Sequence, residues 1–157
     1  MKLKDWLKEN KKVFTDRDFR FLLKQGLGQN PDQLERIKRL YLQGMPMAYI
    51  LGKEEFYGYE FEVSNKVLIP RPETELLVEK AIELIKSKNL KSVLDLCSGC
   101  GNISISIAKQ VSQDVSVFAS DLSPEALEVV KNNIKKHEVP VKVLNADLLK
   151  AFKSKSF

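Results

Sequence analysis

Residues 92–102 constrain the fold of this chain more than any other stretch of the sequence. An apolar run typical of a β-strand, Val93–Leu96, leads into a turn of small residues, and an amphipathic helical pattern follows from about Asn102. This order of strand, small-residue loop and helix is that of the first βα unit of a doubly wound nucleotide-binding sheet. Gly99 and Gly101 allow a sharp turn and a close approach of the backbone to a ligand. The free N–H groups at the start of the predicted helix favour an anionic group of that ligand.

Two acidic residues indicate which ligand this loop would bind. Asp95 precedes Gly99 by four residues, and the next predicted strand, residues 115–120, ends at Asp121. An acid after the second strand can accept both hydroxyls of a ribose, as in NAD sites. An acid ahead of the glycine turn would repel a pyrophosphate, whereas it suits an ammonium group. In addition, the dinucleotide fingerprint has a third glycine at the position where this chain has Ser104. These residues favour S-adenosylmethionine, which carries both an ammonium group and a ribose, and leave NAD as the alternative.

Longer motifs connect the chain with a known family. Residues 95–101 look like the first motif of class I methyltransferases, and the run Ile69-Pro70-Arg71-Pro72-Glu73-Thr74-Glu75 upstream is far more specific. Together with residues 46–52 and 55–58, it makes the chain resemble the release factor glutamine methyltransferases (the HemK/PrmC family) from about Asp16 to the last residue.

Periodicity and resemblance together predict an α/β fold with three parts. Residues 1–45 read as a small helical N-terminal domain of the substrate-recognition type, and residues 46–71 as a β-hairpin connector that turns at Ser64–Lys66. Residues 72–157 read as the first half of a doubly wound, Rossmann-like class I methyltransferase domain. In that domain we expect a helix over 73–86, a helix from Pro124 to His137 capped by Ser123, and a third strand over 141–144.

The resemblance implies methyl transfer from S-adenosylmethionine to the side-chain amide nitrogen of the glutamine in the Gly-Gly-Gln motif of class I release factors. It also implies a set of cofactor-binding residues. Asp95 would lie near the ammonium group, the loop would cradle the methionine part, Asp121 would bind the ribose, and other residues would contact the adenine or border the cleft. The loop residues are Cys97, Ser98, Gly99, Cys100 and Gly101, the adenine contacts are Asp147 and Leu148, and the bordering residues are Arg71 and Thr74.

The Asn-Pro-Pro-Tyr motif of the family has no counterpart in these 157 residues. In the family that loop accepts hydrogen bonds from the substrate amide and aims its nitrogen at the methyl group, and such positioning contributes several kcal/mol to catalysis. We therefore expect the chain as written to contain no catalytic residue and to be inactive alone, as a chain truncated before the catalytic loop. A nucleic-acid adenine methyltransferase and a non-catalytic binding fragment remain the alternative interpretations.

The two cysteines, Cys97 and Cys100, are spaced as in redox and zinc motifs. A structural zinc site needs four ligands, whereas there is no second cysteine pair and the single histidine, His137, is distant in sequence. We interpret both cysteines as small side chains in a tight loop and expect no metal. Cys97 replaces the glycine usual in the family, and a positive φ at this position would strain it.

Charge and hydropathy restrict the cellular setting. The net charge of +5 is a mild surplus, and much of it comes from lysines among the first twelve residues. No apolar run approaches the roughly 20 residues of a membrane span, and the start lacks the continuous apolar core of a signal peptide. These features predict a cytoplasmic protein with no membrane contact. The family resemblance implies a class I release factor as its partner and no direct need for nucleic acid.

Overall fold

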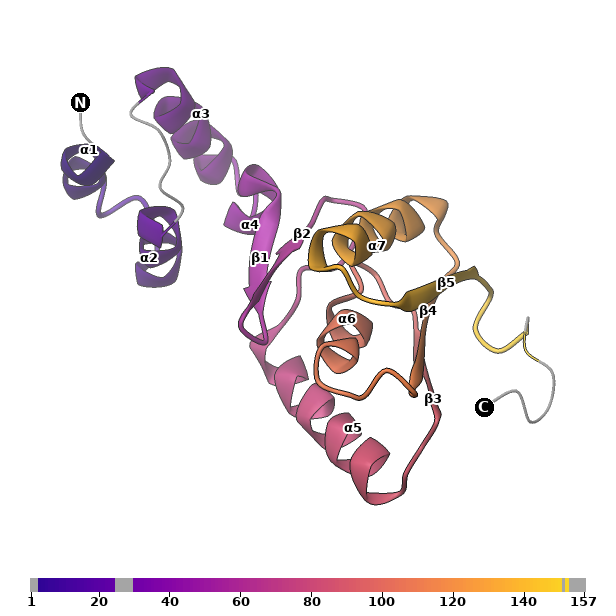
Figure 1. Cartoon of the computed structure of the whole chain (residues 1–157). Helices are drawn as coiled ribbons and strands as arrows, with labels where there is room; N and C mark the ends of the chain where they lie inside the picture. The colour runs from indigo at the N-terminus through magenta and orange to yellow at the C-terminus, as the bar shows by residue number, and fades with distance from the viewer. Residues whose placement is uncertain (1–2, 25–29, 151, 153–157) are drawn as a thin grey trace. The chain divides into compact units, whose positions relative to one another are not determined.

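The computed structural model describes residues 3–24, 30–150 and 152. The chain separates into two compact units, residues 1–51 and 52–157. The boundary falls six residues after the predicted end of the helical part, because a short helix, α4 (Met47–Leu51), belongs to the first unit rather than to the connector (Figure 1).

The described residues of the first unit form α1 (Leu3–Glu9), α2 (Asp16–Lys24), α3 (Pro31–Leu42) and α4. Thr15 caps α2: its Oγ1 accepts a hydrogen bond from the N–H of Asp18 at 3.1 Å and donates one to the Asp18 carboxylate at 2.7 Å. Asn30 caps α3 by accepting from the N–H of Asp32. The helices bury an apolar core made of Trp6, Phe14, Leu22, Leu34, Ile37 and Met47.

The second unit begins with a β-hairpin of β1 (Lys53–Phe56) and β2 (Tyr59–Glu62), which pair antiparallel. Its turn is the two residues Tyr57 and Gly58, whose φ values of 52° and 75° suit a tight hairpin connection. The prediction that the hairpin turns at Ser64–Lys66 is therefore wrong: these residues do form a turn, in which the N–H of Val67 donates to the carbonyl of Ser64 at 3.1 Å, but it lies after the hairpin. Phe56 pairs with Tyr59 next to the turn, and the pair of Lys53 with Glu62 ends the hairpin. The following segment leaves the hairpin and buries Val67 and Ile69.

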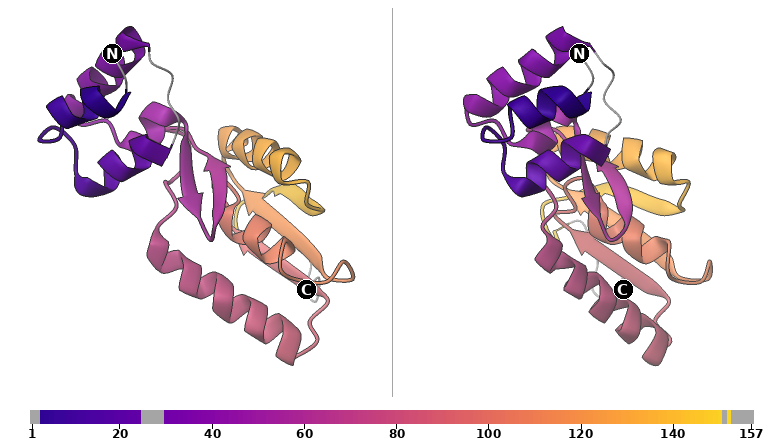
Figure 2. Two further views of the ribbon diagram at one scale, coloured as in Figure 1. Left: turned by 60° about the vertical axis from the view of Figure 1, so that its left-hand side comes forward. Right: turned by 90° about the vertical axis from the view of Figure 1, so that its left-hand side faces the viewer.

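A parallel sheet carries the rest of the unit, with β3 (Ser92–Leu96), β4 (Ser116–Asp121) and β5 (Val141–Asn145) in the order β3-β4-β5. The helices α6 (Asn102–Ala108) and α7 (Pro124–His137) connect successive strands and lie against the same face of this sheet (Figures 1 and 2). Consecutive right-handed crossovers in one direction place their helices on one face. The predicted α/β class is confirmed.

The expected helix over residues 73–86 is α5 (Glu75–Ser87), which packs beside α6. A 3-10 turn over Pro72–Thr74 precedes it, so the α-helix starts two residues later than predicted. On the face of the sheet away from α6 and α7, Leu94, Phe118 and Leu144 are only half-buried. In the part of the chain that the structure describes, no helix has both the length and the apolar character needed to span a membrane.

Candidate functional site

Residues 97–101, here called the glycine loop, join the carboxyl end of β3 to α6. The N–H of Ser98 donates to the carbonyl of Ser120 on β4 at 3.0 Å, and the N–H of Gly101 donates to the carbonyl of Ser98 at 2.7 Å. Gly99 and Gly101 both have positive φ, at 54° and 80°. The loop therefore folds back on itself at the strand ends, where ligands bind in open parallel sheets.

The two glycines are required for different reasons. A Cβ added to Gly101 would lie 2.4 Å from Cγ2 of Val130 on α7, which real side chains do not tolerate. A Cβ added to Gly99 would meet nothing closer than Cβ of Val67, at 4.0 Å. The positive φ of both glycines agrees with the sharp turn predicted from the sequence. Close approach of a ligand to them remains a prediction, and the structure adds that Gly101 is required for packing against α7.

Asp95 is a buried carboxylate beneath the glycine loop, with 8% of its surface exposed. Its Oδ2 accepts a hydrogen bond from the N–H of Ser104 in the first turn of α6, at 3.1 Å. Burial raises the pKa of Asp95 to about 6, Ser104 opposes this rise, and the negative charge of Asp121 adds to it. The positive end of α6 thus already faces a carboxylate, while the hydroxyl of Ser104, at the position of the third fingerprint glycine, donates to the carbonyl of Gly101.

Asp121 ends β4 and connects two loops through its carboxylate. Its Oδ2 accepts from the N–H of Gly99 and its Oδ1 from the N–H of Ser123, each at 3.0 Å. Each carboxylate oxygen has a second lone pair, so both can accept another hydrogen bond. Beside this arrangement, the hydroxyls of Ser98 and Ser120 are buried without a hydrogen-bond partner among the described residues. The site therefore has unused acceptors and donors at the carboxyl ends of β3 and β4.

Comparison with known proteins identifies the family. Residues 72–157 match the model of the methyltransferase small domain. The chain belongs to this family. Together with the relatives described next, this match confirms the predicted resemblance to the release factor glutamine methyltransferases.

Relatives of known name carry the resemblance further. The chain is 38% identical over 128 residues to a release factor glutamine methyltransferase of Dictyoglomus turgidum, covering 82% of this chain and 45% of that one. It is 50% identical over 107 residues to the protein of the same name in Clostridium acetobutylicum, covering 67% and 37%. The Bacillus subtilis protein is 40% identical over 137 residues, covering 83% and 46%. The chain thus spans less than half the length of these three relatives.

Solved structures support the fold of the domain. A 16S rRNA N2 G1207 methyltransferase of T. thermophilus, solved with AdoMet and guanosine, matches with a TM-score of 0.53 at 18% identity, covering 66% of this chain and 29% of that one. A tRNA (uracil-54, C5) methyltransferase of Pyrococcus abyssi, solved with S-adenosyl-L-homocysteine, matches with a TM-score of 0.50 at 24% identity, covering 60% and 23%. At these identities the likeness concerns the fold alone.

The remaining predicted site residues lie in two segments, one that passes the glycine loop and one that follows β5. Arg71 is exposed, and its carbonyl accepts from the N–H of Thr74 at 3.0 Å within the 3-10 turn. Val67, four residues earlier, is the neighbour of Gly99 described above, so the connector passes the loop just before Arg71. The roles of Arg71 and Thr74 at the cleft remain predictions.

The segment after β5 lies next to Asp121, because the N–H of Ala146 donates to the Asp121 carbonyl at 3.1 Å. In this segment the carboxylate of Asp147 pairs with Lys150, and Leu148 is 56% exposed with a φ of 50°. Asp147 and Leu148 directly follow Ala146, whose N–H is bonded to the last residue of β4. Their contact with adenine remains a prediction.

The cysteines of the glycine loop differ in their environment. Cys97 is exposed and has a φ of 58°, so the strain expected for a non-glycine residue is present and costs about 1–2 kcal/mol relative to glycine. Cys100 is buried, and burial raises the pKa of its thiol to about 12, which makes it unreactive at neutral pH. Among the described residues no group of three or more His, Cys, Asp or Glu side chains could hold a metal ion.

Two residues of α7 have roles that sequence analysis missed. Asn133 is fully buried and makes hydrogen bonds to the backbone of both β2 and the glycine loop. His137, interpreted from sequence only as a helix-end residue, lies with its Nε2 3.0 Å from the carbonyl oxygen of Glu60 on β2. The signal for Asn133 was its position three residues after Val130, where a polar side chain interrupts the apolar face of the helix.

Proposed function

We propose that the methyltransferase domain of this chain binds S-adenosylmethionine at the glycine loop. The observation that carries the proposal is the buried carboxylate of Asp95 at the start of α6. A dinucleotide site needs the helix end free for a pyrophosphate, whereas here a carboxylate occupies it and would repel one. The same carboxylate attracts a ligand with an ammonium group, and the unused lone pairs of Asp121 suit the two hydroxyls of a ribose.

Each part of the cofactor has residues that would hold it. Asp95 would lie near the ammonium group, and Asp121 would accept the ribose hydroxyls. The glycine loop would surround the methionine part, together with the Ser98 hydroxyl, which has no hydrogen-bond partner within the described part of the chain. Asp147 and Leu148 would contact the adenine. The bound cofactor supplies an electrophilic methyl group on a sulfonium, and the chain's own residues bind and orient it.

We propose further that this domain serves the methylation of the glutamine amide in the Gly-Gly-Gln motif of class I release factors, in the cytoplasm. The relatives in three bacteria that are named release factor glutamine methyltransferase support the substrate class. The Pro-Arg-Pro-Glu-Thr-Glu run at residues 70–75 supports it as well, since this run resembles the release factor glutamine methyltransferases and is not expected in a nucleic-acid adenine methyltransferase.

Calorimetric titration tests the cofactor. We expect S-adenosylmethionine to bind at least 100-fold more tightly than NAD. We expect Asp121→Asn to weaken the binding of S-adenosylmethionine by about 10- to 100-fold, because hydrogen bonds to a charged group contribute about 1.5–3 kcal/mol. Glu128→Gln, which removes an exposed carboxylate on α7, is the matched control and should bind as the unchanged chain does. Equal affinities for NAD and S-adenosylmethionine would overturn the cofactor proposal.

Binding measurements with macromolecules test the substrate class. We expect the chain to bind a class I release factor and not a single-stranded or double-stranded RNA of similar mass at physiological salt, where non-specific electrostatic binding is weak. A release factor whose Gly-Gly-Gln motif is changed to Gly-Gly-Ala is the control for contact with the methylated loop. Tight RNA binding without release-factor binding would favour the nucleic-acid methyltransferase instead.

A further inference from the structure

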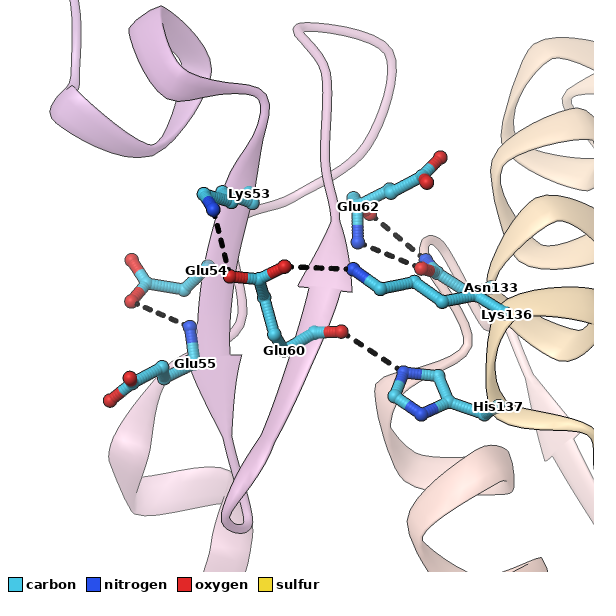
Figure 3. A network of polar contacts seen from close by, with 8 residues as sticks. All are labelled: Lys53, Glu54, Glu55, Glu60, Glu62, Asn133, Lys136 and His137. Carbon is cyan, nitrogen blue, oxygen red and sulfur yellow. Dashed lines mark hydrogen bonds and ion pairs between the residues drawn. The ribbon is translucent and has the colours of Figure 1, made fainter. Parts of the chain in front are cut away.

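Asn133 joins two segments that are far apart in the sequence. Its Oδ1 accepts from the N–H of Glu62 at 2.7 Å, and its Nδ2 donates to the carbonyl of Glu62 at 2.9 Å and to the carbonyl of Cys100 at 2.9 Å. Figure 3 shows the first two of these bonds, which face the last residue of β2. All three partners are backbone groups, so the bonds do not depend on which side chains stand at positions 62 and 100.

The bond to Cys100 fixes one peptide group of the glycine loop. The peptide between Cys100 and Gly101 is planar, so its carbonyl and its N–H point in opposite directions. The carbonyl is held by Asn133, and the N–H donates to Ser98 at 2.7 Å. With both groups bonded, this peptide cannot rotate without breaking two hydrogen bonds. These two hydrogen bonds therefore fix the orientation of the glycine loop between Gly99 and the start of α6.

A buried amide is costly unless all of its polar atoms are bonded. Asn133 has 0% of its surface exposed and uses its acceptor and both sides of its amide nitrogen. An apolar side chain of similar size could fill the same space but would leave the Glu62 and Cys100 groups without partners. Packing alone therefore does not account for an asparagine here.

We propose that Asn133 is a positioning residue that couples the glycine loop to the β1–β2 hairpin. It bonds to the Cys100 carbonyl and at the same time to the backbone at the end of β2. A ligand that restricts the motion of the loop therefore also restricts the motion of the hairpin. The part of this inference that concerns the cofactor rests on the proposed function. The Asn133 side chain acts as a hydrogen-bonded bridge between β2 and the glycine loop, and this role requires no contact between Asn133 and the ligand.

A second connection between α7 and the hairpin provides a matched control. Lys136 Nζ lies 2.9 Å from Oε1 of Glu60, and Lys53 lies 3.0 Å from Oε2 of the same carboxylate (Figure 3). This pair links the same helix to the same strand as Asn133 does, but it is partly exposed and does not reach the glycine loop. Lys136→Gln therefore weakens the attachment of the hairpin and leaves the loop bonded.

The first test compares Asn133→Asp with Lys136→Gln in the 157-residue chain. Aspartate keeps the shape and the acceptor of Asn133 but removes both N–H donors. We expect Asn133→Asp to weaken S-adenosylmethionine binding at least tenfold and Lys136→Gln to change it by less than twofold. Amide hydrogen exchange without ligand should be at least tenfold faster at Gly101 in Asn133→Asp and unchanged in Lys136→Gln. Equal effects of the two variants, or none of either, would overturn the inference.

The second test uses the unchanged chain and so does not depend on a variant that folds. With saturating S-adenosylmethionine we expect the exchange of the Glu62 amide, which donates to Asn133, to slow at least tenfold along with that of Gly99 and Gly101. If the loop amides slow and that of Glu62 does not, the coupling is absent and the inference fails. If the unchanged chain binds no S-adenosylmethionine, the proposed function fails instead, and the exchange at Gly101 without ligand still decides whether Asn133 positions the loop.

Discussion

Replacement of Gly101 by alanine is expected to lower the free energy of unfolding of the methyltransferase domain by about 2–5 kcal/mol. Two costs add. The φ of 80° is unfavourable for any residue with a Cβ, by about 1–2 kcal/mol. The new Cβ would also lie 2.4 Å from Cγ2 of Val130 and 3.2 Å from Cδ1 of Ile105, and overpacking a core costs about 1–3 kcal/mol. Both neighbours are fully buried, so any movement that accommodates the new methyl group must displace other core side chains.

The control for this prediction is Gly99→Ala. Gly99 also has a positive φ, but its added Cβ would make only an ordinary contact with Val67. We therefore expect Gly99→Ala to cost about 1–2 kcal/mol, from the backbone alone. Urea unfolding followed by circular dichroism measures both variants. Equal losses for the two would mean that α7 adjusts to the extra methyl group and that packing is not what requires Gly101.

Replacement of Asp95 by asparagine is expected to affect binding and stability in opposite directions. The affinity for S-adenosylmethionine should fall by about 10- to 100-fold, because the charge facing the ammonium group is lost. The stability of the free chain at pH 7.5 should rise, by at most about 3 kcal/mol. That limit follows from a pKa raised from 3.8 to about 6 at 1.36 kcal/mol for each pH unit. Asparagine can still accept the hydrogen bond of Ser104 without the cost of a buried charge.

The raised pKa of Asp95 makes the stability of the folded chain depend on pH. The folded state holds a proton on Asp95 more tightly than the unfolded state does, so between about pH 6 and pH 4 acidification stabilises the folded state through this group. His137 acts in the opposite direction, because burial lowers its pKa. The difference between the unchanged chain and Asp95→Asn isolates the Asp95 contribution. The difference in the free energy of unfolding between the two chains should shrink from pH 7.5 to pH 4.5. A difference that does not depend on pH would show that the pKa of Asp95 is not raised in the folded state.

Local sequence patterns predicted the elements of the methyltransferase domain well. The strand, glycine loop and helix over residues 92–108, and the cap at Ser123 with the helix to His137, follow from periodicity and capping that act within a few residues. The hairpin was placed wrongly because Tyr57-Gly58 and Ser64–Lys66 both favour a turn. The choice between them depends on which strands pair, and Val67 and Ile69 leave the sheet to be buried elsewhere.

The sequence by itself determined the order of strands, loop and helices along the chain, with one acid near the end of β3 and the other at the end of β4, because these features depend on short-range periodicity and on the direction of the chain. Only the tertiary structure decided what those residues contact. Asp95 bonds to the start of α6, Gly101 packs against Val130, and Asn133 bonds to residues 33 and 71 positions away in the sequence. Such contacts form when distant segments pack together, and no local pattern specifies them.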